Sequence, residues 1–124
     1  MAGIRYSLIY ESTWWEDVCR IERDGARWAA LIDGAETFIE RTPEVVPSRT
    51  AHGNRVMPTA KYVRGLAIPM YITFAILKFA VGDEPSDPGD FGEVSLRHVI
   101  TEADARAGLY FDYDPDFEWT GECP

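Results

Sequence analysis

Hydrophobic and polar residues alternate at the start of the chain. Ile4, Tyr6, Leu8 and Tyr10 are apolar, and polar or charged residues separate them. A period of two is typical of a half-buried β-strand. The pattern therefore predicts a strand over residues 4–10.

Two later segments also have the character of strands. Tyr71–Val81 is almost continuously apolar and rich in aromatic and β-branched residues, which predicts a central strand covered on both faces. Glu93–Ile100 alternates again, and we expect Val94, Leu96 and His98 to share one face of a second strand.

Residues 13–33 fit two interpretations. In a hairpin, Asp24-Gly25 would form a type I′ turn, and the resulting register would pair Glu22 with Arg27 and Ile21 with Trp28. One assumption then explains a charge pair and apolar pairs, so we favour the hairpin.

The alternative for this segment is helical. Thr13-x-x-Glu16 would form a capping box, Trp14, Val18 and Ile21 would share one face, and Gly25 would follow the helix. A longer helical stripe reaching residue 39 is also conceivable, but Gly34 in its interior would cost about 1 kcal/mol relative to alanine.

The other elements are shorter. The sequence pattern predicts short helices over residues 35–41 and 101–108. It also predicts one or two helical turns over residues 59–68, before Pro69. We expect loops at residues 42–59 and 82–92, because both segments are rich in proline, glycine and polar residues.

This order of elements predicts an α+β fold. We expect one globular domain over residues 1–124, with an antiparallel or mixed sheet of four to six strands and one to three short helices. The longest apolar stretch, Gly65–Leu77, is too short for a bilayer span of about 20 residues. We therefore expect no membrane association.

Charge is distributed unevenly along the chain. The net charge is −9, but residues 1–82 are nearly neutral, whereas residues 83–124 hold twelve acids against Arg97 and Arg106. Phosphate backbones require a positive surface, so direct nucleic-acid binding is not expected. A basic protein partner fits the charge better. Self-association is the other expected possibility, because edge strands and aromatic strips can also pair with a second copy.

The densest acidic segment alternates with aromatic residues over residues 111–119. On an extended chain, Asp112, Asp114, Asp116 and Glu118 would form one face, and the neighbouring aromatic residues the other. These four acids are candidate binding residues, together with Tyr113, Phe117 and Trp119.

Trp14 completes the candidate binding set. Trp14 and Trp15 are adjacent, so on a strand their indoles would face opposite ways, and one would be partly exposed as an anchor for a partner.

The acidic segment also permits two ordinary interpretations. It could be an edge strand whose charges face water and oppose aggregation. It could also pack against the basic stretch 41–64 of the same chain, which carries Arg41, Arg49, Arg55, Lys61 and Arg64.

No motif identifies a catalytic residue, a metal site or a cofactor. Glycine-rich phosphate loops and the G-x-S-x-G nucleophile elbow are absent from the sequence, and the acidic loop 82–92 does not match a calcium-binding loop. His52 and His98 lack a metal-binding motif, so we expect structural roles for both.

Without a secretion signal, Cys19 and Cys123 are expected to be reduced in the cytoplasm.

The sequence leaves three functions open. The leading hypothesis is a small acidic non-catalytic protein, of the inhibitor, immunity or antagonist type, that binds a macromolecule through the acidic-aromatic C-terminal surface. The first alternative is an enzyme or ligand binder with an apolar pocket inside a curved sheet, containing a buried carboxylate or His98. The second alternative is a subunit of a symmetric or virion-type assembly.

Overall fold

A computed structural model describes residues 3–48 and 53–107. Its regular elements follow one another in the order β1 (Tyr6–Tyr10), α1 (Ser12–Ile21), α2 (Gly25–Arg41), β2 (Asn54–Pro58), α3 (Thr59–Tyr62), β3 (Met70–Lys78), β4 (Gly92–Thr101) and α4 (Glu102–Arg106). Short 3₁₀ turns lie at Pro43–Val45 and Pro88–Asp90.

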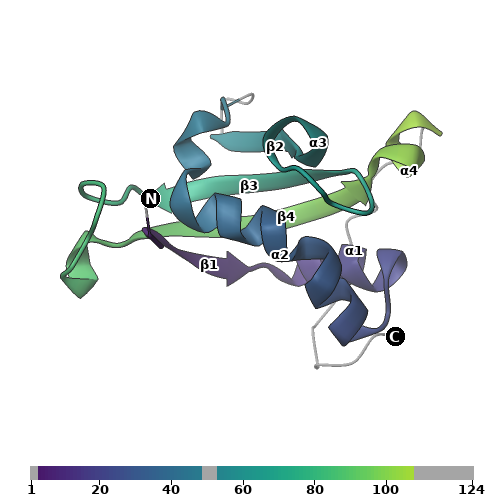
Figure 1. Cartoon of the computed structure of the whole chain (residues 1–124), viewed down its shortest axis with the longest axis horizontal. Helices are drawn as coiled ribbons and strands as arrows, with labels where there is room; N and C mark the ends of the chain where they lie inside the picture. Colours follow the sequence, from purple (N-terminus) through teal and green to yellow (C-terminus); the bar gives the residue numbers. More distant parts are fainter. Residues whose placement is uncertain (1–2, 49–52, 108–124) are drawn as a thin grey trace.

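The four strands form one mixed sheet in the order β1-β4-β3-β2 (Figure 1). β1 is parallel to β4, whereas β3 is antiparallel to both β4 and β2. The expected α+β domain is confirmed, and β3 is an interior strand as predicted. The described residues contain four α-helices rather than one to three, and α2 is 17 residues long.

The core lies between α2 and one face of the sheet. Trp28, Ile32, Ala35 and Ile39 are buried at the three- and four-residue spacing of a helical stripe. They belong to the same apolar cluster as inward-facing strand residues such as Phe74, and Figure 1 shows α2 lying across the sheet. Burial of this apolar stripe against the sheet therefore stabilises residues 25–41 as a helix.

Gly34 lies inside α2 at a close approach to the segment after α3. A Cβ on Gly34 would lie 3.2 Å from Val63 Cγ1 and 3.4 Å from Leu66 Cδ2. We expected a glycine here to oppose a long helix. Its missing side chain instead allows the two segments to pack closely, which offsets its low helix propensity.

The expected hairpin over residues 13–33 is wrong. Asp24 is the N-cap of α2, and its carboxylate accepts a hydrogen bond from the backbone N–H of Arg27 at 3.0 Å. The sequence Asp-Gly therefore begins a helix rather than a type I′ turn. The helical alternative over residues 13–21 is correct, although Thr13 makes no capping bond and its hydroxyl donates to the carbonyl of Arg97 at 2.6 Å.

Two strand details also differ from expectation. Residues 54–58, expected within a loop, form the edge strand β2. In β4, Leu96 pairs with Phe74 and His98 pairs with Thr73, so Arg97 is an extra residue in a bulge. Because adjacent strand residues face opposite sides, this bulge places His98 on the opposite face from Leu96.

Cys19 is disulfide-bonded, which corrects the expectation of reduced thiols. The sequence has one other cysteine, Cys123, which lies outside the described residues. Within residues 3–48 and 53–107, no helix combines the length and apolar character needed to cross a bilayer.

Candidate binding surface

The structure does not describe most of the candidate binding residues. These are the acidic-aromatic segment 111–119, expected to be extended, and its candidate residues Asp112, Tyr113, Asp114, Asp116, Phe117, Glu118 and Trp119, all of which lie outside the described residues. Trp14 is described, and its side chain lies in the core with an exposed fraction of 0%. Trp14 therefore packs the core and does not form a contact surface, while its neighbour Trp15 is half-buried.

Exposed apolar side chains gather where β3 ends. Leu77, Phe79 and Val81 follow one another at every second position, and their exposed fractions are 53%, 57% and 61%. Ile4, just before β1, is exposed to 57%. Isolated exposed apolar residues are common, but three in one short segment mark a candidate contact surface.

Acidic side chains continue directly from this apolar row. Asp83, Glu84 and Asp87 are exposed on the loop between β3 and β4. We define the β3–β4 surface as these three acids together with Leu77, Phe79 and Val81. It places exposed apolar side chains directly beside a cluster of negative charge.

Backbone contacts fix the shape of the loop. The N–H of Val81 donates to the carbonyl of Asp90 at 2.8 Å, and the N–H of Asp90 donates to the carbonyl of Asp87 at 2.9 Å. Lys78 Nζ closes the loop further by donating to the carbonyl of Gly89 at 2.7 Å. The acids are therefore presented by a loop with internal hydrogen bonds.

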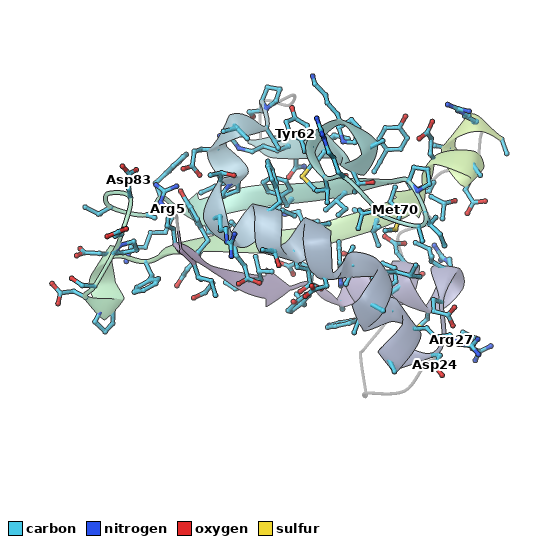
Figure 2. The ribbon with its side chains drawn as sticks, viewed as in Figure 1. Arg5, Asp24, Arg27, Tyr62, Met70 and Asp83 are labelled. Carbon is cyan, nitrogen blue, oxygen red and sulfur yellow. The ribbon has the colours of Figure 1, made fainter. Side chains whose placement is uncertain are left out.

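Arg5 connects this loop to the rest of the fold. Its Nε donates to the carbonyl of Gly82 at 3.0 Å, its Nη1 donates to the carbonyl of Arg41 at 2.9 Å, and it forms an ion pair with Glu44. The hydrogen bond that Arg5 donates to Glu44 raises the pKa of Arg5, burial opposes the rise, and Asp83 adds a small increase. Figure 2 shows Arg5 and Asp83 at the same end of the molecule.

Sequence reasoning missed the apolar half of this surface. Residues 71–81 were expected to form one strand covered on both faces, but β3 ends at Lys78, and a register shift lies between Ile76 and Lys78. The useful signal was Lys78 itself, because a charge near the end of an apolar run indicates that this end reaches solvent.

Other polar groups of the described chain serve the fold. Asp17 is buried to 3% exposure, and its Oδ2 accepts from the N–H of Val99 at 3.1 Å and contacts His98 Nδ1 at 2.9 Å. Ser95 Oγ donates to Glu11 Oε1 at 2.6 Å. Among the described residues, no group of three or more histidine, cysteine, aspartate or glutamate side chains could hold a metal ion.

Tyr10 and Glu36 form a second partly buried pair. The Tyr10 hydroxyl donates to Glu36 Oε2 at 2.5 Å, and the Tyr10 ring lies 4.9 Å from the Trp15 ring between centroids. Burial raises the pKa of Tyr10, and the hydrogen bond to Glu36 raises it further. Burial also raises the pKa of Glu36, against the opposing hydrogen bond from Tyr10. Both shifts favour the neutral forms.

One open pocket of about 340 Å³ lies between α2 and the end of α3. It is not the pocket that the enzyme hypothesis requires. Tyr62 lines it, but neither a carboxylate nor His98 does, and it lies outside the sheet. Arg41 and Arg64 line it beside the apolar side chains of Phe38, Tyr62 and Val63.

Comparison with protein-family models, with curated proteins and with solved structures found no match to this chain.

Proposed function

We propose that this chain is a small non-catalytic protein that binds a basic macromolecular partner, as an inhibitor, immunity-type protein or antagonist does. The observation that carries the proposal is the β3–β4 surface, where exposed Leu77, Phe79 and Val81 lead directly into exposed Asp83 and Glu84. A few residues that lose contact with water on binding supply most of the affinity of an interface. Acidic groups around them accelerate association and select a basic partner.

The acidic-aromatic segment 111–119 extends the same proposal. It belongs to the part of the chain, residues 83–124, that holds twelve acids and two arginines. Two acidic segments in one third of the chain support a partner with an extended basic surface, such as the cleft of a nucleic-acid-binding enzyme. In this proposal the chain itself does not bind nucleic acid.

A second copy of the chain is the competing partner. The exposed apolar row on the β3–β4 surface would support a symmetric assembly as readily as a foreign partner. A symmetric contact would bring like charges at Asp83, Glu84 and Asp87 close together, which opposes self-association at low salt. Light scattering across a range of salt concentrations separates the two cases.

The cytoplasmic location expected from the sequence is not part of the proposal. Cys19 is disulfide-bonded, and persistent disulfides are rare in the cytosol. The proposal therefore specifies the chemistry of the partner and leaves its compartment unspecified.

The test compares two charge-reversed variants as baits in extracts of the source cell. Asp83→Lys/Asp87→Lys should lose the partner that the wild-type chain captures, and wild-type capture should weaken as salt rises. Asp33→Lys/Asp104→Lys is the matched control, because it makes the same change in net charge at exposed positions away from the β3–β4 surface.

Two results would contradict the proposal. One is equal loss of the partner in both variants, which would indicate a general effect of net charge. The other is normal capture by both Asp83→Lys/Asp87→Lys and a variant in which Asp112, Asp114, Asp116 and Glu118 are all reversed.

A further inference from the structure

The pocket between α2 and α3 has a chemistry unlike that of the rest of the molecule. Two arginines, two threonines and two aromatic residues line most of it, namely Arg41, Arg64, Thr37, Thr42, Phe38 and Tyr62. No carboxylate is among the lining residues, although the chain carries a net charge of −9. The pocket is therefore a local basic site on an acidic protein.

Arg41 is the lining residue whose side chain has an unsatisfied polar group. Its Nε–H is buried and has no hydrogen-bond acceptor among the described residues. Buried donors in folded proteins are usually satisfied, and the described residues leave this one unpaired beside the pocket. Guanidinium groups bind carboxylate and phosphate oxygens in a planar, often bidentate geometry.

The threonines add neutral donors beside this charge. Thr37 and Thr42 line the pocket together with Arg41, and each hydroxyl can donate one hydrogen bond. An anionic group with two or three oxygens could therefore be held by the guanidinium and a hydroxyl at once.

An aromatic pair forms the apolar part of the pocket. The rings of Phe38 and Tyr62 lie 5.5 Å apart between centroids, at an interplanar angle of 44°. Val63 adds an aliphatic wall, and Gly34 adds none because it has no side chain. Figure 2 labels Tyr62, which is the last residue of α3. Such a wall favours a flat apolar ligand body over a fully hydrated ion.

We propose that this pocket binds a small organic anion in which a carboxylate or phosphate is joined to an aromatic ring. The anionic group contacts Arg41 and Arg64, and the ring packs against Phe38 and Tyr62. The volume of about 340 Å³ lies at the lower end of the range for small-molecule sites, which fits a single substituted ring. The site shares no residue with the β3–β4 surface, so either proposal can fail without the other.

The experiment is an NMR titration of the ¹⁵N-labelled full chain with four probes: phenyl phosphate, benzoate, inorganic phosphate and benzamide. Phenyl phosphate and benzoate should both shift the backbone amides of Gly34, Thr37, Thr42 and Val63. Comparing these two probes identifies the preferred anionic group. Inorganic phosphate lacks the ring and benzamide lacks the charge, so each should bind at least about tenfold more weakly than its partner probe.

Two variants test the assigned groups. Arg64→Gln removes a cation from an exposed position where it should not affect folding, and Thr37→Val removes a hydroxyl with little change in shape. Arg64→Gln should weaken both aromatic anions by at least about tenfold, and Thr37→Val should weaken them less. Arg27→Gln, which removes an exposed arginine at the start of α2, is the matched control and should bind like the wild type.

The proposal is overturned if none of these amides shifts at millimolar probe, or if benzamide binds as tightly as benzoate. It is also overturned if inorganic phosphate matches phenyl phosphate, or if Arg64→Gln and Arg27→Gln have equal effects.

Discussion

The buried carboxylate of Asp17 accepts a hydrogen bond from the backbone N–H of Val99, at a point where β4 has no neighbouring strand on that side. β1 pairs with β4 only as far as Tyr10 and Leu96. Beyond that point, the Thr13 hydroxyl donates to the carbonyl of Arg97, and the Asp17 carboxylate accepts from the N–H of Val99. Two side chains one helical turn apart on α1 therefore replace the missing strand and protect an open edge.

Replacing Asp17 tests this role. Asp17→Ala leaves the buried N–H of Val99 without its acceptor and removes the contact with His98, so we expect a loss of about 2–4 kcal/mol in the free energy of unfolding. Asp17→Asn retains one carbonyl oxygen as an acceptor and should cost less. Chemical denaturation of both variants measures the difference, and an unchanged unfolding midpoint for Asp17→Ala would contradict the role.

Gly92 has a different structural requirement at the start of β4. A Cβ at this position would lie 2.3 Å from Tyr6 Cε1 and 2.5 Å from the carbonyl oxygen of Lys78. The backbone oxygen cannot move without disturbing the β3–β4 pairing, so Gly92→Ala should destabilise the protein by at least about 2 kcal/mol.

Gly89→Ala is the control for this prediction. A Cβ on Gly89 would meet nothing within 4 Å. This substitution should leave the free energy of unfolding within about 0.5 kcal/mol of the wild type. Equal thermal stability of the two variants would show that Tyr6 and β3 do not restrict position 92.

Periodic patterns in the sequence predict the elements of this fold better than their pairing. The alternation at residues 4–10 and the apolar run before Lys78 correctly predict β1 and β3. Asp24-Gly25 was misinterpreted because an aspartate before a glycine suits both a tight turn and a helix N-cap. The choice depends on the stripe from Trp28 to Ile39, which finds its partner face only once the sheet is assembled.

The candidate surface depends even more on tertiary structure. Leu77 and Phe79 resemble core residues in the sequence, but both are exposed, Leu77 near the end of β3 and Phe79 just after it. The bulge at Arg97, which turns His98 to the other face, likewise has no sequence signal that hydrophobic alternation can reveal. Local patterns therefore predicted β3, but could not predict which part of it meets solvent.

The disulfide at Cys19 should contribute measurably to stability. Cys123 is the only other cysteine in the sequence, so a bond within the chain would close a loop of about 100 residues. Reducing agent should lower the free energy of unfolding by about 2–4 kcal/mol. Cys19→Ser should already be less stable and should not respond to the reducing agent. Rapid alkylation of both thiols in the untreated native protein would contradict the prediction.

Glu36 and Glu44 should affect the pH dependence of stability in opposite directions. Burial raises the pKa of Glu36 above its ordinary value of 4.5. The folded state then binds this proton more tightly than the unfolded state, so the contribution of Glu36 to stability falls as the pH rises through the raised pKa. Burial opposes ionisation of Glu44, but the hydrogen bond from Arg5, a backbone hydrogen bond and the positive charge of Arg5 together outweigh burial and lower the pKa of Glu44. The contribution of Glu44 is present above the ordinary value and is lost as the pH falls through the lowered pKa.

The paired variants Glu36→Gln and Glu44→Gln separate these effects. At pH 7, Glu36→Gln should raise the free energy of unfolding, because the neutral amide avoids burying a charge and its carbonyl oxygen can still accept from Tyr10. Glu44→Gln should lower it, because the ion pair with Arg5 is lost. The Glu36 difference should shrink as the pH falls through the raised pKa toward 4.5, whereas the Glu44 difference should shrink only as the pH falls below 4.5, through the lowered pKa. Both variants remove one negative charge, so a change of the same sign in both would indicate that net charge, rather than these local contacts, controls the response. Urea denaturation between pH 3 and pH 7 measures both curves.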